Sequence, residues 1–260
     1  MPRTAVITGA GSGVGRAAAV RLSREGWRVA LLGRRRATLD ATGRLLAAGS
    51  YVVVECDVGA PGASAGAAAA ARAFCGAGGL DALLNVAGVA PRARVGETDE
   101  ARLRACFDAN AAGPALLVAA LWDDLVAARG RVVNVSSFSA VDPFAGFLAY
   151  GASKAALESL TRSVNVEGGR AHTLRLGAVE TPMLRGLFDE AQLPPADALP
   201  PAAVAAEISA ILAGDRDDRA VVELVVNPKD GATFDNDAPA APPPLPRPPR
   251  WHLPDFFRRS

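Results

Sequence analysis

Residues 4–15 read Thr4-Ala5-Val6-Ile7-Thr8-Gly9-Ala10-Gly11-Ser12-Gly13-Val14-Gly15. The short apolar run at 4–8 predicts a buried strand, and the glycines after it predict a tight turn into a helix at 13–25. Glycines in such a turn let the backbone approach a pyrophosphate closely. The helix N-terminus then offers free N–H groups and the positive end of its dipole. This stretch therefore favours a dinucleotide site on the first strand of an α/β fold.

The alternation of strand and helix continues along the chain. Nearly continuous apolar runs predict further strands at 28–32, 51–56, 82–85, 131–136, 171–176 and 220–226. The stretches between them predict helices at 37–48, 63–74, 99–128, 150–166 and 202–212. Strands that are apolar throughout are typical of a parallel sheet covered on both faces. With right-handed crossovers this predicts a Rossmann-like, doubly wound α/β fold of about seven strands.

Composition limits the classes of protein to consider. The 260 residues are 50% hydrophobic, enough for one large domain, and the net charge of +1 gives no case for nucleic acid or an anionic membrane as partner. The three cysteines, Cys56, Cys75 and Cys106, form no C-x-x-C spacing and indicate a reducing compartment. His172 and His252 are the only histidines, too few for most metal sites. No metal is expected.

The N-terminus runs directly into a strand without the apolar region of a signal peptide. The longest apolar stretch, at 111–122, is shorter than a membrane span. We expect a soluble, cytoplasmic protein. Residues 1–237 form one predicted domain, and 238–260 form a proline-rich tail whose segment APAAPPPLPRPPR predicts polyproline II structure.

Three motifs carry a resemblance to a known family. The turn has the spacing T-G-x-x-x-G-x-G, Asp57-Val58 follows the third predicted strand, and Asn85-Val86-Ala87-Gly88 follows the fourth. With these motifs the chain resembles the short-chain dehydrogenase/reductase family over residues 4–183, although Val86 replaces the second asparagine of the family motif. The resemblance implies NAD(P)(H) binding by Thr8, Gly9, Gly11, Ser12, Gly13, Val14, Gly15, Arg34, Arg35, Asp57, Val58, Asn85, Ala87, Gly88, Tyr150, Lys154, Val179 and Thr181.

The end of the second predicted strand bears on which dinucleotide binds. It reads Gly33-Arg34-Arg35-Arg36, with no acid to hold the ribose hydroxyls and with arginines suited to a 2′-phosphate. This favours NADP(H), while NAD(H) stays possible. A solvated basic turn is the alternative, and Ser12 stands where many NADP-preferring relatives carry a basic residue.

Tyr150 and Lys154 are four residues apart, so a helix places them on one face, where the ammonium would stabilise a phenolate and lower the tyrosine pKa. Ser137 precedes Tyr150 by the offset of the family's catalytic serine, and we expect Ser136 to point elsewhere. The resemblance also assigns Asn110, which holds a water in the family's proton relay. By analogy Tyr150 transfers the hydroxyl proton, Lys154 tunes it and binds the nicotinamide ribose, and Ser137 positions the carbonyl.

The substrate side is mostly apolar. The residues that gather where the family builds its substrate cleft are Ser137, Phe138, Phe144, Phe147, Met183, Leu187 and Phe188. A lid at about 184–200 is expected, and ordinary packing within that lid is the alternative explanation for these side chains. Arg92, Arg94 and Arg185 are candidates to meet an acidic substrate group, although exposed arginines usually meet water.

These residues predict an oxidoreductase that interconverts a carbonyl and a secondary alcohol on a largely apolar small molecule. One alternative is a catalytically silent dinucleotide-binding sensor or scaffold. Another is an interaction protein that acts through the proline-rich tail. The resemblance further implies a homodimer or homotetramer.

Overall fold

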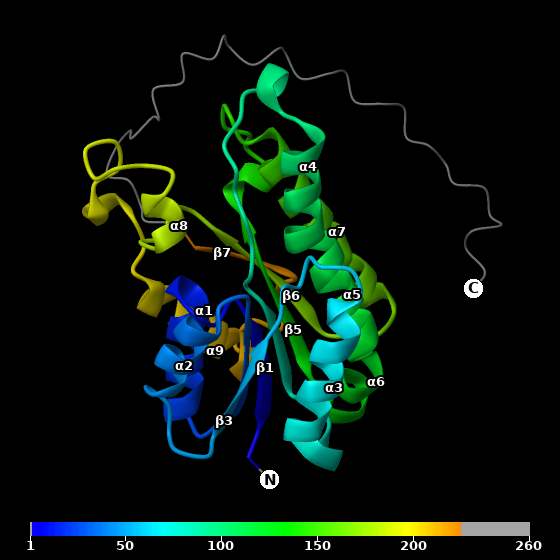
Figure 1. Cartoon of the computed structure of the whole chain (residues 1–260). Helices are drawn as coiled ribbons and strands as arrows, with labels where there is room; N and C mark the ends of the chain where they lie inside the picture. The colour runs from blue at the N-terminus through cyan, green and yellow to red at the C-terminus, as the bar shows by residue number, and fades with distance from the viewer. Residues whose placement is uncertain (1, 225–260) are drawn as a thin grey trace, which may run out of the picture.

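Seven parallel strands form one sheet at the centre of the computed structural model, which describes residues 2–224 (Figure 1). The order across the sheet is β3-β2-β1-β4-β5-β6-β7, and every neighbouring pair is parallel. The strands are β1 (Thr4–Thr8), β2 (Arg28–Gly33), β3 (Tyr51–Glu55), β4 (Ala82–Asn85), β5 (Arg131–Ser137), β6 (Ala171–Leu176) and β7 (Val221–Leu224). The predicted Rossmann-like α/β fold is confirmed.

Helices cover both faces of the sheet (Figure 1). The helices on one face are α1 (Gly13–Arg24), α2 (Arg36–Gly43) and α9 (Pro201–Ala213). Those on the other are α3 (Ala63–Cys75), α4 (Glu100–Phe107), α5 (Gly113–Ala120), α6 (Trp122–Ala128) and α7 (Leu148–Val166). Because successive side chains of a strand point to opposite faces, Ile7 joins the core under α1 while Val6 joins the core under α5. This is why the strands read as apolar throughout.

The single helix predicted at 99–128 is wrong, because the chain bends and widens there. A π-helical turn, Asp108–Ala112, separates α4 from α5, and Leu121 separates α5 from α6. Pro114 has no N–H to continue the regular ladder. A Cβ on Gly113 would lie 2.3 Å from the Val58 carbonyl oxygen, so the helix backbone passes directly against the loop after β3. Both effects shape the segment that carries Asn110.

Two other boundaries differ from expectation. Helix α2 ends at Gly43 rather than at residue 48. At Gly43 a Cβ would lie 2.3 Å from the Tyr51 ring, so only a glycine fits there. The last predicted strand is described only as far as Leu224, so its expected end at 225–226 lies outside the described residues, as do the proline-rich tail and His252.

Within residues 2–224 no single helix is long and apolar enough to cross a membrane. The pair Glu100–Ala120 and Trp122–Ala128 meets that criterion jointly by length and composition, with a 63° bend between its halves. In the same range no three His, Cys, Asp or Glu side chains are grouped to hold a metal ion.

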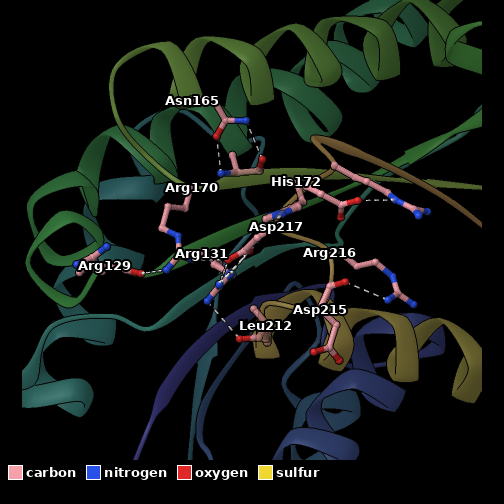
Figure 2. Close-up of polar contacts among 12 residues, drawn as sticks. Arg129, Arg131, Asn165, Arg170, His172, Leu212, Asp215, Arg216 and Asp217 are labelled. Carbon is pink, nitrogen blue, oxygen red and sulfur yellow. Dashed lines mark hydrogen bonds and ion pairs between the residues drawn. The ribbon is translucent and has the colours of Figure 1, made fainter.

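An ion-pair cluster ties the amino-terminal ends of β5 and β6 to the loop after α9 (Figure 2). Asp217 accepts hydrogen bonds from Arg131 and Arg170, both at 2.7 Å. His172, with 5% of its surface exposed, places Nε2 3.9 Å from the same carboxylate, while its Nδ1 is buried without a hydrogen-bond partner among the described residues. Burial lowers the pKa of His172, and Arg131 and Arg170 lower it further, against the opposing effects of Asp217 and the Arg216 backbone. The fold therefore favours neutral His172.

This arrangement predicts a loss of stability in mild acid. Because the pKa of His172 is lower in the folded protein than in the unfolded chain, the unfolded state binds the proton more readily. The unfolding free energy should then fall below about pH 6.5, with a limiting slope of about 1.4 kcal/mol per pH unit. The lowered pKa of Asp217 acts in stronger acid, because its contribution is lost only as the pH falls from the ordinary aspartate value through the lowered one.

Urea unfolding at several pH values between 5.5 and 7.5, on wild type and His172→Gln, measures this slope. We expect His172→Gln to flatten it. An equal slope in both proteins would contradict the assignment.

Candidate active site

A cavity of about 1570 Å³ opens at the carboxyl ends of the strands, beside β1, where the strand order reverses. Such a switch point is where doubly wound sheets bind their ligands. The predicted cofactor residues that line it are Gly9, Gly11, Ser12, Gly13, Val14, Gly15, Arg34, Arg35, Asp57, Val58, Ala87, Gly88, Tyr150, Lys154, Val179 and Thr181. The predicted substrate residues that line it are Ser137, Phe138, Phe144, Phe147, Met183, Leu187 and Phe188. One cavity thus contains both sets.

Thr8 and Asn85, also predicted as cofactor residues, do not line the cavity and lie buried behind it. The Thr8 hydroxyl accepts the N–H groups of Val86 (2.9 Å) and Ala87 (3.0 Å). The Asn85 side chain donates to the Asn134 side chain at 2.8 Å. Both side chains fix the loop after β4, so their contribution to the cavity is indirect.

The glycine-rich turn has no room for side chains where it faces the rest of the protein. At Gly9, whose φ is +69°, a Cβ would lie 2.9 Å from the Ala87 nitrogen. On Gly11 it would lie 2.4 Å from the Thr38 hydroxyl, and on Gly15 2.3 Å from the Gly9 carbonyl. The bare backbone and the first N–H groups of α1 border the cavity, a cradle that fits a pyrophosphate.

The far end of this cradle is basic. Arg34 and Arg35 are exposed, line the cavity, and form no ion pair with any residue in 2–224. Arg36, the next residue, points its guanidinium to Asp40 at 3.5 Å. Asp57 lines the cavity, with its carboxylate accepting the Gly59 N–H at 3.1 Å.

Tyr150 and Lys154 lie on one face of α7, and both line the cavity. Lys154 is only 4% exposed, its Nζ donates to the Val135 carbonyl at 2.8 Å, and it lies 5.8 Å from the Tyr150 ring centroid. Burial lowers the pKa of Lys154 to about 8, although the nearby Cys106 thiol opposes that shift. The helix thus holds an ammonium beside the tyrosine at a substantial desolvation cost.

The expected lowering of the Tyr150 pKa by Lys154 is not seen. Burial raises the pKa of Tyr150, and the group that opposes this rise is the Ser137 hydroxyl. At neutral pH the phenol is therefore protonated and faces Ser137, an arrangement suited to donating a proton.

The two serines that end β5 point in different directions, as expected. The Ser137 hydroxyl lies on the cavity and accepts the Ser139 N–H at 3.2 Å. Ser136 is buried, and its hydroxyl donates to Glu158 at 2.8 Å. Glu158 also accepts two hydrogen bonds from Arg175, at 3.0 and 2.7 Å. This network joins α7, β5 and β6 directly behind Ser137.

Asn110 is fully buried in the π-helical turn, outside the cavity lining. Its amide oxygen accepts the Val89 N–H at 2.8 Å, and its amide nitrogen donates to the Val89 carbonyl and to the Ser153 hydroxyl, both at 2.9 Å. Ser153 in turn donates to the Tyr150 carbonyl at 2.7 Å. Ser153 was not predicted from the sequence, where its signal was a small polar residue between Tyr150 and Lys154 on a buried helix. The water-holding role of Asn110 stays a prediction.

Aromatic rings form the substrate side of the cavity. The Phe147 ring meets the Tyr150 ring edge-on at 5.9 Å and stacks on the Phe188 ring at 6.3 Å. The expected lid contains helix α8 (Pro182–Arg185) at its start, capped by Thr181, and a short 3-10 turn at Pro195–Asp197. The lid also has a small apolar cluster of its own, so both explanations of its apolar residues hold in part.

Comparison with known proteins identifies the family. A family model for short chain dehydrogenases matches residues 3–192. The chain belongs to this family. It is 31% identical over 195 residues to carbonyl reductase family member 4 of Danio rerio, and the matched region covers 74% of this chain and 81% of that protein. It is 34% identical over 204 residues to 2-(R)-hydroxypropyl-CoM dehydrogenase of Xanthobacter autotrophicus, with the same two coverages.

Solved structures agree with the sequence relatives. A short chain dehydrogenase/reductase family protein superimposes with a TM-score of 0.75 at 29% identity, covering 85% of this chain and 95% of that one. A putative betaketoacyl-ACP reductase gives a TM-score of 0.74 at 28% identity, covering 86% and 96%. This short chain dehydrogenase is therefore an NAD(P)-dependent oxidoreductase.

The buried ammonium gives a prediction about stability. Lys154→Met replaces a desolvated charge by an apolar chain of similar length, so it should raise the unfolding free energy at pH 7. The gain in unfolding free energy should be about 2 to 3 kcal/mol. It is the desolvation cost implied by the lowered Lys154 pKa, at about 1.4 kcal/mol per pKa unit, minus the free energy of the lost hydrogen bond to the Val135 carbonyl. Because the pKa of Lys154 is lower in the folded protein than in the unfolded chain, the gain is full below about pH 8 and shrinks above it.

Urea unfolding of wild type and Lys154→Met at pH 7 and pH 9.5 measures both effects, with Arg162→Met as the control for removing a positive charge elsewhere on α7. A gain that does not change with pH, or no gain at all, would contradict a desolvated ammonium.

Proposed function

We propose that the protein interconverts a ketone and a secondary alcohol, with NADP(H) as the preferred cofactor and a largely apolar small molecule as substrate. The observation that carries the proposal is that one cavity contains both predicted sets of residues. It joins the glycine-rich cradle, the Ser137, Tyr150 and Lys154 side chains, and a wall of aromatic rings.

The chain's own residues support proton transfer to a carbonyl. When bound, a reduced nicotinamide supplies the hydride. The Ser137 hydroxyl donates a hydrogen bond to the substrate oxygen, and the protonated Tyr150 phenol donates its proton to that oxygen. The Lys154 ammonium stabilises the phenolate that remains. Asn110 holds the Val89 backbone and, through Ser153, the start of α7.

The preference for NADP(H) is supported by the two unpaired arginines after β2. Arg34 and Arg35 line the cavity next to the cradle and make no ion pair in the described part of the chain, whereas Arg36 turns to Asp40. β2 itself ends at Gly33 and carries no acid to hold the ribose hydroxyls. A 2′-phosphate would provide the anionic partner that these arginines lack.

Fluorescence titration with NADPH and NADH tests the cofactor. We expect wild type to bind NADPH more tightly. Arg34→Ala should weaken NADPH binding roughly tenfold or more, the value of a charge-assisted hydrogen bond, and leave NADH binding nearly unchanged. The neighbouring Arg36→Ala is the control and should affect neither. Binding of neither dinucleotide would contradict the proposed function.

A panel of aryl and alkyl ketones then tests catalysis, followed by NADPH consumption with Tyr150→Phe as the inactive control. Tight NADPH binding without turnover of any ketone or secondary alcohol would favour the silent sensor or scaffold instead.

Three predictions from the sequence stay predictions: a role for the tail, a homodimer or homotetramer, and a cytoplasmic location. They can be tested by truncation after Gly231, by sedimentation velocity and by cell fractionation, respectively.

A further inference from the structure

Arg92 lies on the aromatic wall of the substrate side, and the proposed hydride and proton transfers do not use it. Its guanidinium carbon is 5.3 Å from the Phe188 ring centroid and 6.0 Å from that of Phe147. It lines the same cavity as Tyr150. A guanidinium held over ring faces keeps its N–H edge free to bond elsewhere.

The backbone around Arg92 is fixed relative to Tyr150. Ala93 donates its N–H to the Gly146 carbonyl at 3.0 Å and forms a β-bridge with Phe147, just before α7 begins. Gly146 has a φ of +85°, and a Cβ there would lie 3.0 Å from the Arg92 Cγ. The stem of Arg92 thus occupies space that only a glycine leaves open. The Phe147 ring connects Arg92 to Tyr150: its centroid is 6.0 Å from the Arg92 guanidinium carbon and 5.9 Å from the Tyr150 ring centroid. The distance from the guanidinium carbon to the Tyr150 ring centroid therefore cannot exceed the sum of these two.

No carboxylate in residues 2–224 forms an ion pair with Arg92. The other candidates named from the sequence differ from it. Arg185 is paired with Glu180 at 2.7 Å and donates to the Leu193 carbonyl at 2.9 Å, so its donors are already engaged by the protein. Arg94 lines the cavity, but within residues 2–224 its guanidinium lies over no aromatic ring. Asp142 and Asp197 also line the cavity, so the inference depends on the placement of Arg92 rather than on net charge.

We infer that the substrate carries a carboxylate at the end remote from the reacting carbonyl, and that Arg92 binds it through two parallel hydrogen bonds. The inference rests on the proposed function and refines it, since the apolar wall then holds the middle of an oxo acid. An extended chain advances about 1.2 Å per bond, so roughly four to eight bonds separate the two groups. A planar fork on a rigid support is the geometry that suits a carboxylate.

Matched pairs of ligands test this inference. The test ligands are ω-benzoyl alkanoates with roughly three to seven methylene groups, each beside its neutral primary amide. At saturating NADPH we expect wild type to favour the acid of one chain length over its amide by roughly ten- to a hundredfold in kcat/KM. Arg92→Gln should remove that preference by lowering kcat/KM for the acid alone. Arg92→Lys should keep part of it, because it retains the charge and loses the fork.

Arg94→Gln is the matched control, because Arg94 is exposed like Arg92 but lies over no ring in residues 2–224. It should leave the ratio of acid to amide within about twofold of wild type. A readout without turnover uses the saturated ω-phenyl alkanoate. Its binding to the NADPH complex, measured by calorimetry, should weaken in Arg92→Gln and persist in Arg94→Gln.

The outcomes separate the two proposals. Equal kcat/KM for acid and amide in wild type, or equal losses for both ligands in Arg92→Gln, would overturn the inference while the reduction itself stands. Tight NADPH binding without reduction of any pair, or of any ketone in the panel, would overturn the proposed function and the inference with it.

Discussion

The close approach of two loops, one after β1 and one after β4, is the constraint on which the structure depends. The Thr8 hydroxyl accepts two consecutive N–H groups of the second loop, and Gly9 brings its Cα against the Ala87 nitrogen. β1 and β4 are neighbours in the sheet, although α1, α2 and α3 lie between them in the chain. The contact between their loops therefore closes the switch point of the sheet. It leaves bare backbone facing the cavity on both sides, which is what a dinucleotide requires.

A second feature is the buried polar framework around α7. Lys154 bonds the β5 backbone, Glu158 binds Ser136 and Arg175, and Asn110 binds the start of the helix through Ser153. Such groups contribute little net stability and are costly when one partner is lost. They hold α7 in one register against β5, so Tyr150 and Ser137 face each other. The ammonium of Lys154 is kept at a stability cost, as is common where chemistry needs a perturbed pKa.

The sequence predicted what depends on local pattern. Buried parallel strands are apolar throughout, and glycine spacing marks the turn, so the fold and most cavity residues followed from single stretches. What depends on contacts between distant segments did not follow. The π-helical turn arises where Gly113 meets the Val58 carbonyl, although Pro114 was a local sign of a break. The burial of Thr8 and Asn85, the raised pKa of Tyr150 and the stacking of Arg92 on Phe188 each require the folded neighbourhood.

The central claim is that a carbonyl carbon receives hydride in the cavity beside Tyr150. The most direct measurement follows deuterium from NADPH labelled at the nicotinamide C4 into product, by mass spectrometry and NMR, in wild type and Tyr150→Phe. The account predicts deuterium on the carbinol carbon of one alcohol enantiomer with wild type, and almost none with the variant. Oxidation of the labelled cofactor without deuterium in the alcohol, or equal labelling with Tyr150→Phe, would contradict it.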